Sequence, residues 1–259
     1  MSETILVERE GGLVTVTLNR PAKLNAMTME MYRRFGETFD VLNADDAVRC
    51  VIVRGAGDRA FCPGSDIAEF DEVRTGIDKA KEYARFTMDA TLKLYDCPHP
   101  TVALIQGVCV GGGLEIAAMC DFRLCGRSSR FGIPINRLGL TVDYDELEIL
   151  TRLIGPAATL ELLLEGRVFG ADEALSMGLV GRVVDDEKVE AEAYDLAGRI
   201  AAGAPLVNRW HKKFVRRLAR PGSPSNDERE EAYACYETED FRIGCAAFEA
   251  KETPEFKGK

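Results

Sequence analysis

The sequence predicts an α/β domain built on a largely parallel sheet, with a helical region at its C-terminal end. Three observations predict this class. Two continuous apolar runs, residues 50–55 and 101–107, have the form of strands buried on both faces. Segments with helical spacing alternate with these runs, as in a parallel sheet whose crossovers are helices. From about Val189 onward, every segment has helical character apart from a break near "RPGSPSN".

The elements of the first half follow from local patterns. Residues 13–18 alternate apolar and other side chains, which predicts a strand. After a loop, Thr28 is expected to cap a helix that runs to about Leu42. The buried strand 50–55 is followed by a Gly- and Pro-containing loop and a helix over about 79–95. No second strand is recognisable between Val53 and Thr101, which predicts long crossovers and a wound spiral rather than a Rossmann sheet.

In the second half, strand 101–107 leads into three consecutive glycines and a helix that carries Glu115. "DFRLCG" predicts a short strand, and "DELEILTRLIG" and "ATLELLLEG" have helical spacing. "ADEALSMGLVGRVV" predicts a short helix, a glycine stop and a strand. The order of elements therefore remains that of an α/β domain.

Composition limits the classes of function. The chain has 259 residues, enough for one large domain or for one domain with a small addition. Hydrophobic residues make up 46% and charged residues 29%, which is typical of a soluble globular protein. With 33 basic and 43 acidic side chains the net charge is −10, and this disfavours a nucleic-acid partner. An anionic small substrate would need a local basic pocket.

Cysteine usage and the N-terminus predict a cytoplasmic protein without metal. The eight cysteines form no C-x-x-C motif and only two histidines are present, so no zinc site is expected. Buried thiols suit a reducing compartment, and "MSETILVERE" is not a signal peptide. Residues 100–120 are apolar enough to suggest a membrane span, but Gln106, Glu115 and four glycines favour a buried strand, turn and helix.

The triple glycine, Gly111 to Gly113, admits three interpretations. A phosphate cradle is disfavoured because neither nucleotide-binding glycine motif is present. The glycines could simply allow a strand and a helix to pack closely. They could also form half of an oxyanion hole, because a helix N-terminus presents free N–H groups and positive potential.

A second loop, "AFCPGSDIAEF", has the same design. Ser65 follows Gly64 and offers a backbone N–H, whereas Pro63 has none to give. Two such loops, each following a strand, can supply one donor each to a single oxygen. Paired donors of this kind suit the enolate that forms from a thioester.

The chain resembles the crotonase family, the enoyl-CoA hydratase/isomerase superfamily. The matching stretches, which cover nearly the whole chain in the family's order, are "LNRPAKLNAM", "AFCPGSDIAEF", "GVCVGGGLEIAAMCDFRL", "FGIPINRLGL", "GADEALSMGLVGRVV" and "EDFRIGCAAFEAKETPEF". The resemblance implies a spiral of ββα units over residues 1–200 and a C-terminal helical region over 201–259. It also implies assembly as trimers or dimers of trimers, and an acyl-CoA substrate with no separate cofactor.

The resemblance also implies site residues. The oxyanion donors would be the backbone N–H groups of Ser65 and Gly112, and the CoA moiety would lie near "RPAKLNA", where Arg20 and Lys23 could meet phosphates or could be ordinary surface charges. The further positions expected to surround the substrate are Ala26, Asp66, Ile67, Gly111 and Ile135.

Glu115 matches the first of the two catalytic glutamates of family hydratases. Burial among apolar residues should raise the pKa of Glu115, which suits proton exchange, although a purely structural buried acid is the alternative. The second glutamate of the hydratases is missing, because Ile135 occupies its position, four residues before Gly139.

Asp143 is the candidate for a second acid. It lies four residues after Gly139, a position that resembles the one carrying an aspartate in dienoyl-CoA isomerases and in chlorobenzoyl-CoA dehalogenase. The alternative is that Asp143 only caps the helix that follows. Asp145 and Glu146 are interpreted as first-turn acids favoured by the helix dipole.

The function predicted is that of an enoyl-CoA hydratase acting on 2-enoyl-CoA thioesters through the oxyanion hole and Glu115. A double-bond isomerase of enoyl- or dienoyl-CoA is the first alternative, because one or two acids that move a proton between carbons would suffice. Hydrolysis, decarboxylation or dehalogenation of an acyl-CoA is another. A non-catalytic acyl-CoA-binding protein is the remaining one.

Overall fold

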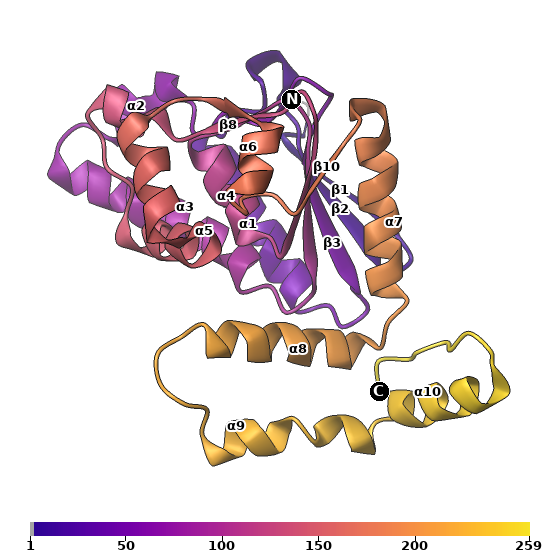
Figure 1. Ribbon diagram of the computed structural model, residues 1–259. Helices are drawn as coiled ribbons and strands as arrows, with labels where there is room; N and C mark the ends of the chain where they lie inside the picture. Colours follow the sequence, from indigo (N-terminus) through magenta and orange to yellow (C-terminus); the bar gives the residue numbers. More distant parts are fainter. Residues whose placement is uncertain (1–2) are drawn as a thin grey trace.

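The computed structural model of the chain describes residues 3–259, and its centre is a six-stranded sheet (Figure 1). β1 pairs with β2 in antiparallel fashion, and every other neighbouring pair in this sheet is parallel. In spatial order the strands are β1 (Ile5–Glu10), β2 (Leu13–Leu18), β3 (Cys50–Gly55), β5 (Thr101–Ile105), β7 (Phe122–Gly126) and β10 (Arg182–Val184).

A second sheet contains four short strands, and each ββα unit of the spiral places one strand in each of the two sheets. Its order is β4 (Ala60–Cys62), β6 (Val108–Val110), β8 (Arg130–Gly132) and β9 (Phe169–Gly170). The chain runs β3–β4, β5–β6 and β7–β8, and each pair is followed by helix, so the predicted spiral of ββα units is confirmed. The expectation of no second strand between Val53 and Thr101 is wrong, because β4 lies there; three residues are too few to show a pattern.

Helices fill the space beside the sheets. The longer ones of the core are α1 (Met29–Asn43), α3 (Ile77–Tyr95), α4 (Gly112–Met119), α5 (Tyr144–Glu165), α6 (Ala171–Ser176) and α7 (Val189–Ala201). Short segments are α2 (Phe70–Val73) and the 3-10 turns η1 (Pro21–Lys23), η2 (Ile67–Glu69), η3 (Pro134–Leu138), η4 (Asp186–Lys188) and η5 (Ala234–Glu237). Helix α7 covers the face of the six-stranded sheet opposite to α1, α3 and α4 (Figure 1).

Local signals account for two of these helices. The Thr28 hydroxyl accepts a hydrogen bond from the Met31 N–H at 3.2 Å, so the predicted N-cap of α1 is confirmed. Helix α5 contains Gly155 at φ 77°, followed by Pro156. A positive φ interrupts helical geometry, and proline cannot donate to the preceding turn. The two helical patterns seen in the sequence are therefore the two halves of one kinked helix.

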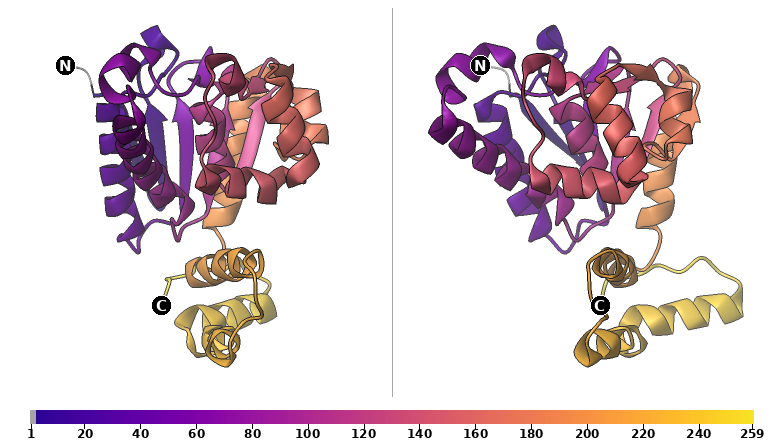
Figure 2. Two further views of the ribbon diagram at one scale, coloured as in Figure 1. Left: turned by 90° about the vertical axis from the view of Figure 1, so that its left-hand side faces the viewer. Right: turned by 60° about the vertical axis from the view of Figure 1, so that its left-hand side comes forward.

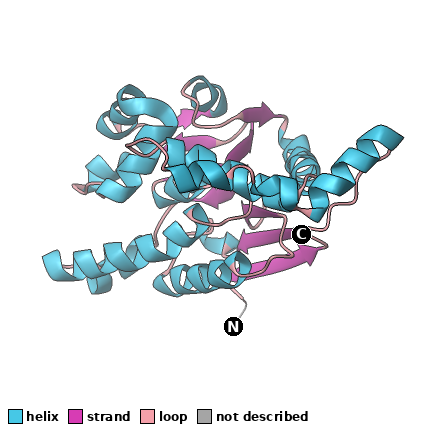
Figure 3. Ribbon diagram, turned by 90° about the horizontal axis from the view of Figure 1, so that it is seen from below, coloured by secondary structure: helices cyan, strands magenta, loops and turns pink. Residues whose placement is uncertain are grey.

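The last three helices, α8 (Pro205–Leu218), α9 (Asn226–Glu231) and α10 (Glu239–Ala250), form a layer below the core (Figures 1 and 2). Viewed from below, they cross the underside of the sheet (Figure 3). Helix α8 is joined to the core by Asp121, whose carboxylate contacts Lys212 Nζ at 2.6 Å and Arg216 Nη2 at 2.9 Å. Over residues 3–259, none of the helices has both the length and the apolar character needed to cross a bilayer.

Candidate active site

The two glycine-bearing loops lie against each other because the strands before them are neighbours. β4 and β6 are paired in parallel, so the loops that leave their carboxyl ends emerge side by side. The approach is close: a Cβ added to Gly64 would stand 2.9 Å from the Gly112 nitrogen. Gly64 also has φ 102°, a conformation that L side chains rarely adopt. Position 64 therefore requires glycine for two reasons, namely the close approach of the Gly112 nitrogen and the positive φ.

Both expected donors are free. Within residues 3–259, no acceptor is found for the backbone N–H of Ser65 or of Gly112. Gly112 is the first residue of α4, where an N–H has no intrahelical partner and the helix dipole adds positive potential. The geometry thus presents two unengaged amides, one from each loop, to the same region.

Glu115 lies in the first turn of α4, close enough to the Glu146 carboxyl group of α5 for each to affect the charge of the other. Burial raises the pKa of Glu115 well above its ordinary value, and the nearby Glu146 carboxylate raises it further. Burial likewise raises the pKa of Glu146. Burial and the neighbouring carboxylate therefore both favour the protonated form of Glu115.

Glu146, interpreted from the sequence as a first-turn acid favoured by the helix dipole, is the second carboxyl group at this place in the structure. It occupies the third position of α5. A signal was available in the sequence. Glu146 is on the same helix face as Ile149 and Leu150, which are buried. An acid on the apolar stripe of a helix points inward.

Asp143 and Ile135 occupy other positions in the structure. Asp143 is exposed at the N-cap position of α5, and its side chain makes no capping hydrogen bond. It is near enough for its charge to raise the pKa of Glu146. Ile135, in η3, packs against the hydrophobic core. A catalytic part for Asp143 stays a prediction.

The residues expected around the substrate fall into two groups. Arg20 and Asp66 pair with each other at 2.6 Å, and the Asp66 carboxylate also accepts from the Ala68 N–H at 3.1 Å. These two side chains tie the loops together, so Arg20 is less available for a phosphate. Lys23 is exposed, as is Ile67. Ala26 is buried beside Met27, and Gly111 has φ 52°. Their contacts with a substrate stay predictions.

Three hydroxyl groups meet beside the two loops, and none was identified from the sequence. Ser65 Oγ lies 3.0 Å from Tyr32 Oη and 2.6 Å from Tyr83 Oη. Arg74 stacks on this cluster, with its guanidinium carbon 4.7 Å from the centre of the Tyr83 ring. No sequence motif joins these residues, because they come from α1, the β4 loop and α3.

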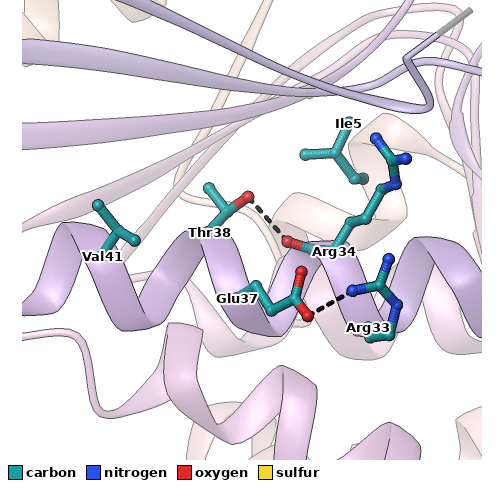
Figure 4. Close-up of a pocket in the computed structure, with 6 residues that line it drawn as sticks. All are labelled: Ile5, Arg33, Arg34, Glu37, Thr38 and Val41. Atoms are coloured by element: carbon teal, nitrogen blue, oxygen red, sulfur yellow. Dashed lines mark hydrogen bonds and ion pairs between the residues drawn. The ribbon is translucent and has the colours of Figure 1, made fainter.

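A separate groove lies on the outer side of α1 (Figure 4). Among its walls are exposed ion pairs within α1, such as that of Arg33 with Glu37. The residues that line it are Ile5, Arg33, Arg34, Glu37, Thr38 and Val41. It contains no group of the acid pair and no hydroxyl of the cluster, so this groove is separate from the candidate active site.

Comparisons with known proteins agree with this geometry. The family model described as "Enoyl-CoA hydratase/isomerase" matches residues 8–259. A crotonyl-CoA hydratase of Syntrophomonas wolfei is 32% identical, with 99% of each chain covered. A 1,2-epoxyphenylacetyl-CoA isomerase of Escherichia coli is also 32% identical, with 100% of each chain covered. A crystal structure described as an enoyl-CoA hydratase/carnithine racemase, from Magnetospirillum magneticum, is 47% identical and has a TM-score of 0.98 over 100% of this chain and 97% of that one.

Proposed function

The chain belongs to the enoyl-CoA hydratase/isomerase family, and from that premise we propose that it hydrates 2-enoyl-CoA thioesters. The observation that carries this proposal is the Glu115–Glu146 pair beside two free backbone amides. Hydration needs a base for water, an acid for the α-carbon and a site for negative charge on the thioester oxygen. The pair supplies the first two when one of its carboxyl groups is ionised and the other is protonated.

The steps follow from that arrangement. The N–H groups of Ser65 and Gly112 hold the thioester oxygen and stabilise the enolate that forms on it. The ionised carboxylate of the pair takes a proton from water as the water oxygen bonds to C3. The protonated carboxyl then gives its proton to C2 as the enolate collapses. Water is thus added across the double bond, and proton transfer within the pair restores the starting state.

Double-bond isomerisation is the second candidate. It is favoured by Ile135, which stands where the resemblance expects a second glutamate. The E. coli relative, an isomerase of an epoxide thioester, shows only that isomerases occur among similar proteins. An acid pair could remove a proton from one carbon of an enolisable thioester and return it to another. A non-catalytic acyl-CoA-binding protein is the third candidate, in which the same loops would hold a ligand without turning it over.

One set of assays separates these candidates. Hydration of crotonyl-CoA would remove the conjugated enoyl absorbance, and this is the expected result. Isomerisation of a 3-enoyl-CoA would create that absorbance. If crotonyl-CoA is unchanged while a 3-enoyl-CoA is converted, the hydratase proposal is wrong. If thioesters bind and none is converted, the non-catalytic candidate stands instead.

A further inference from the structure

The hydroxyl cluster is formed by two buried tyrosines and the half-buried Ser65. Tyr32 and Tyr83 are 4% and 6% exposed, and both direct their hydroxyls at Ser65 Oγ. Burial raises the pKa of each phenol above its ordinary value. Each of the three hydroxyls therefore keeps its proton under ordinary conditions.

One O–H group of the cluster has no hydrogen-bond acceptor within the cluster. Three hydroxyls carry three protons, but only two hydrogen bonds join them. Tyr83 donates to Ser65, and Ser65 can in turn donate to Tyr32, which leaves the Tyr32 O–H without an acceptor among residues 3–259. In the reverse arrangement Ser65 would accept twice and keep the spare proton. Because an unpaired buried donor is costly, the cluster is short of one acceptor.

The Tyr32 hydroxyl lies beside both loops that carry the free backbone amides. A Cβ added to Gly112 would lie 3.4 Å from Tyr32 Oη and 3.6 Å from Glu115 Oε2. Since both atoms surround that one point, they are at most 7.0 Å apart. The Tyr32 hydroxyl therefore adjoins both residues whose N–H groups are free, Ser65 and Gly112.

We propose that the Tyr32 hydroxyl is a third donor to the thioester oxygen, in addition to the N–H groups of Ser65 and Gly112. The inference rests on the proposed function, because that oxygen belongs to an acyl-CoA. Tyr83 and the Ser65 hydroxyl act as positioning groups: each donates to the next, and a donor that is itself accepting a hydrogen bond is strengthened. Tyr32 is then a catalytic residue, because it touches the oxygen on which charge builds.

The test uses acetoacetyl-CoA, a β-keto thioester whose enolate absorbs in the near ultraviolet, so no turnover is required. The measurement is the enolate-to-keto ratio of the bound ligand at one fixed pH. Tyr32→Phe should lower this ratio by about 10-fold or more, because a hydrogen bond to a charged oxygen is lost. Ser65→Ala should lower it less, because the Tyr32 hydroxyl remains but is no longer polarised. Tyr83→Phe should have the smallest effect.

Tyr194→Phe is the matched control. The Tyr194 hydroxyl is hydrogen-bonded to Thr15 Oγ1 at 2.9 Å, on the α7 side of the sheet, so its loss removes a similar bond far from the site. The enolate-to-keto ratio of acetoacetyl-CoA bound to the Tyr194→Phe variant should equal the ratio measured with the unchanged protein.

Three results would count against the inference. An unchanged enolate ratio in Tyr32→Phe, with binding retained, would overturn it. If Tyr32→Phe does not fold, an unchanged ratio in Ser65→Ala would do the same. If the unchanged protein does not bind acetoacetyl-CoA at all, the proposed function fails first, and the third donor fails with it.

Discussion

At the residue scale, the charge state of Glu115 links activity to stability. Burial and Glu146 raise the pKa of Glu115 in the folded chain above its ordinary value of 4.5. The folded state therefore binds a proton more tightly than the unfolded state does. The stability that this proton provides is fully present below about pH 4.5 and is lost as the pH rises through the folded pKa.

Replacing Glu115 with Gln should remove this loss of stability at high pH, because Gln does not ionise. The variant should melt about 2–4 °C higher than the unchanged protein at pH 8, and the difference should shrink toward pH 4.5. Turnover should fall about 10²- to 10⁴-fold, because a group that transfers protons is gone. Thermal unfolding at several pH values gives the first result, because the titration of every other group is common to both proteins and cancels. A variant that is less stable at pH 8 would show that Glu115 is not held protonated.

The identity of the second acid is a separate prediction. Glu146→Gln should lower kcat about 100-fold, because Glu146 is the carboxyl beside Glu115. Asp143→Asn should change kcat less, since Asp143 is exposed, and Asp145→Asn serves as the control for loss of a neighbouring first-turn acid. Steady-state kinetics on crotonyl-CoA measure all three. A larger loss in Asp143→Asn than in Glu146→Gln would restore Asp143 as the second catalytic acid.

Gly64 offers a test of the oxyanion geometry. Gly64→Ala should lower kcat/KM about 100-fold, because its Cβ would push against the Gly112 nitrogen, one of the two donors. Gly57→Ala is the control: Gly57 also has a positive φ, 75°, but nothing lies within 4 Å of a Cβ there. Both variants should lose about 1 kcal/mol of stability from backbone strain. Equal activity in the two would mean that the Gly64–Gly112 contact does not shape the site.

Only part of the candidate site is recognisable in the sequence. Ser65, Gly112 and Glu115 could be predicted because each belongs to a short motif in which neighbours in sequence are neighbours in space. Glu146 and Tyr32 could not, because their places in the candidate site come from contacts with residues of distant elements. A single sequence shows which residues a loop carries, but not which side chains other helices bring to that loop.

At the scale of elements, the Asp121 carboxylate makes the most buried ionic contact between α8 and the core, beside the more exposed contact of Arg209 with Asp46. Asp121 contacts Lys212 and Arg216 and also accepts a hydrogen bond from the Thr101 N–H at 2.8 Å. The Lys212 side chain is only 8% exposed, so in Asp121→Asn its ammonium group would keep its hydrogen bond to the His99 carbonyl but lose its charged partner.

The expected cost of Asp121→Asn is about 3 kcal/mol, measured by urea unfolding, together with faster proteolysis within the C-terminal helices. Glu231→Gln is the control, because the Glu231–Lys213 pair is more exposed and should contribute less than about 1 kcal/mol. Equal effects of the two substitutions would mean that the Asp121 carboxylate does not hold α8 to the core.

The longer strands could be predicted from the sequence more readily than the short ones. β2 and β3 were predicted with the bounds that the structure gives, since six residues are enough to show alternation or a continuous apolar run. The strands of the second sheet have two or three residues each and leave no period to detect. Their existence follows from pairing, which is a tertiary property.

At the scale of the whole molecule, the C-terminal layer carries aromatic side chains that the chain does not cover. Phe248 is 86% exposed, and Tyr233 and Tyr236 are 63% and 60% exposed. Such residues are enriched where proteins associate. We propose that this layer joins copies of the chain into a trimer or a dimer of trimers.

Phe248→Glu should therefore weaken assembly. Placing a charge in an apolar contact should shift the sedimentation of the protein toward the monomer in analytical ultracentrifugation. Glu249→Gln, at the exposed position next to it, should leave the distribution unchanged. If the unchanged protein sediments as a monomer, the assembly proposal is wrong.

The spatial order of the six-stranded sheet has a consequence for how the protein is made. The strands stand in the same order as they occur along the chain, and each new strand pairs with one that precedes it. Because synthesis begins at the N-terminus, the β1–β2 hairpin leaves the ribosome first and offers a template to β3. Each later strand finds its neighbour already formed, so the sheet is suited to growing outward while translation is still in progress.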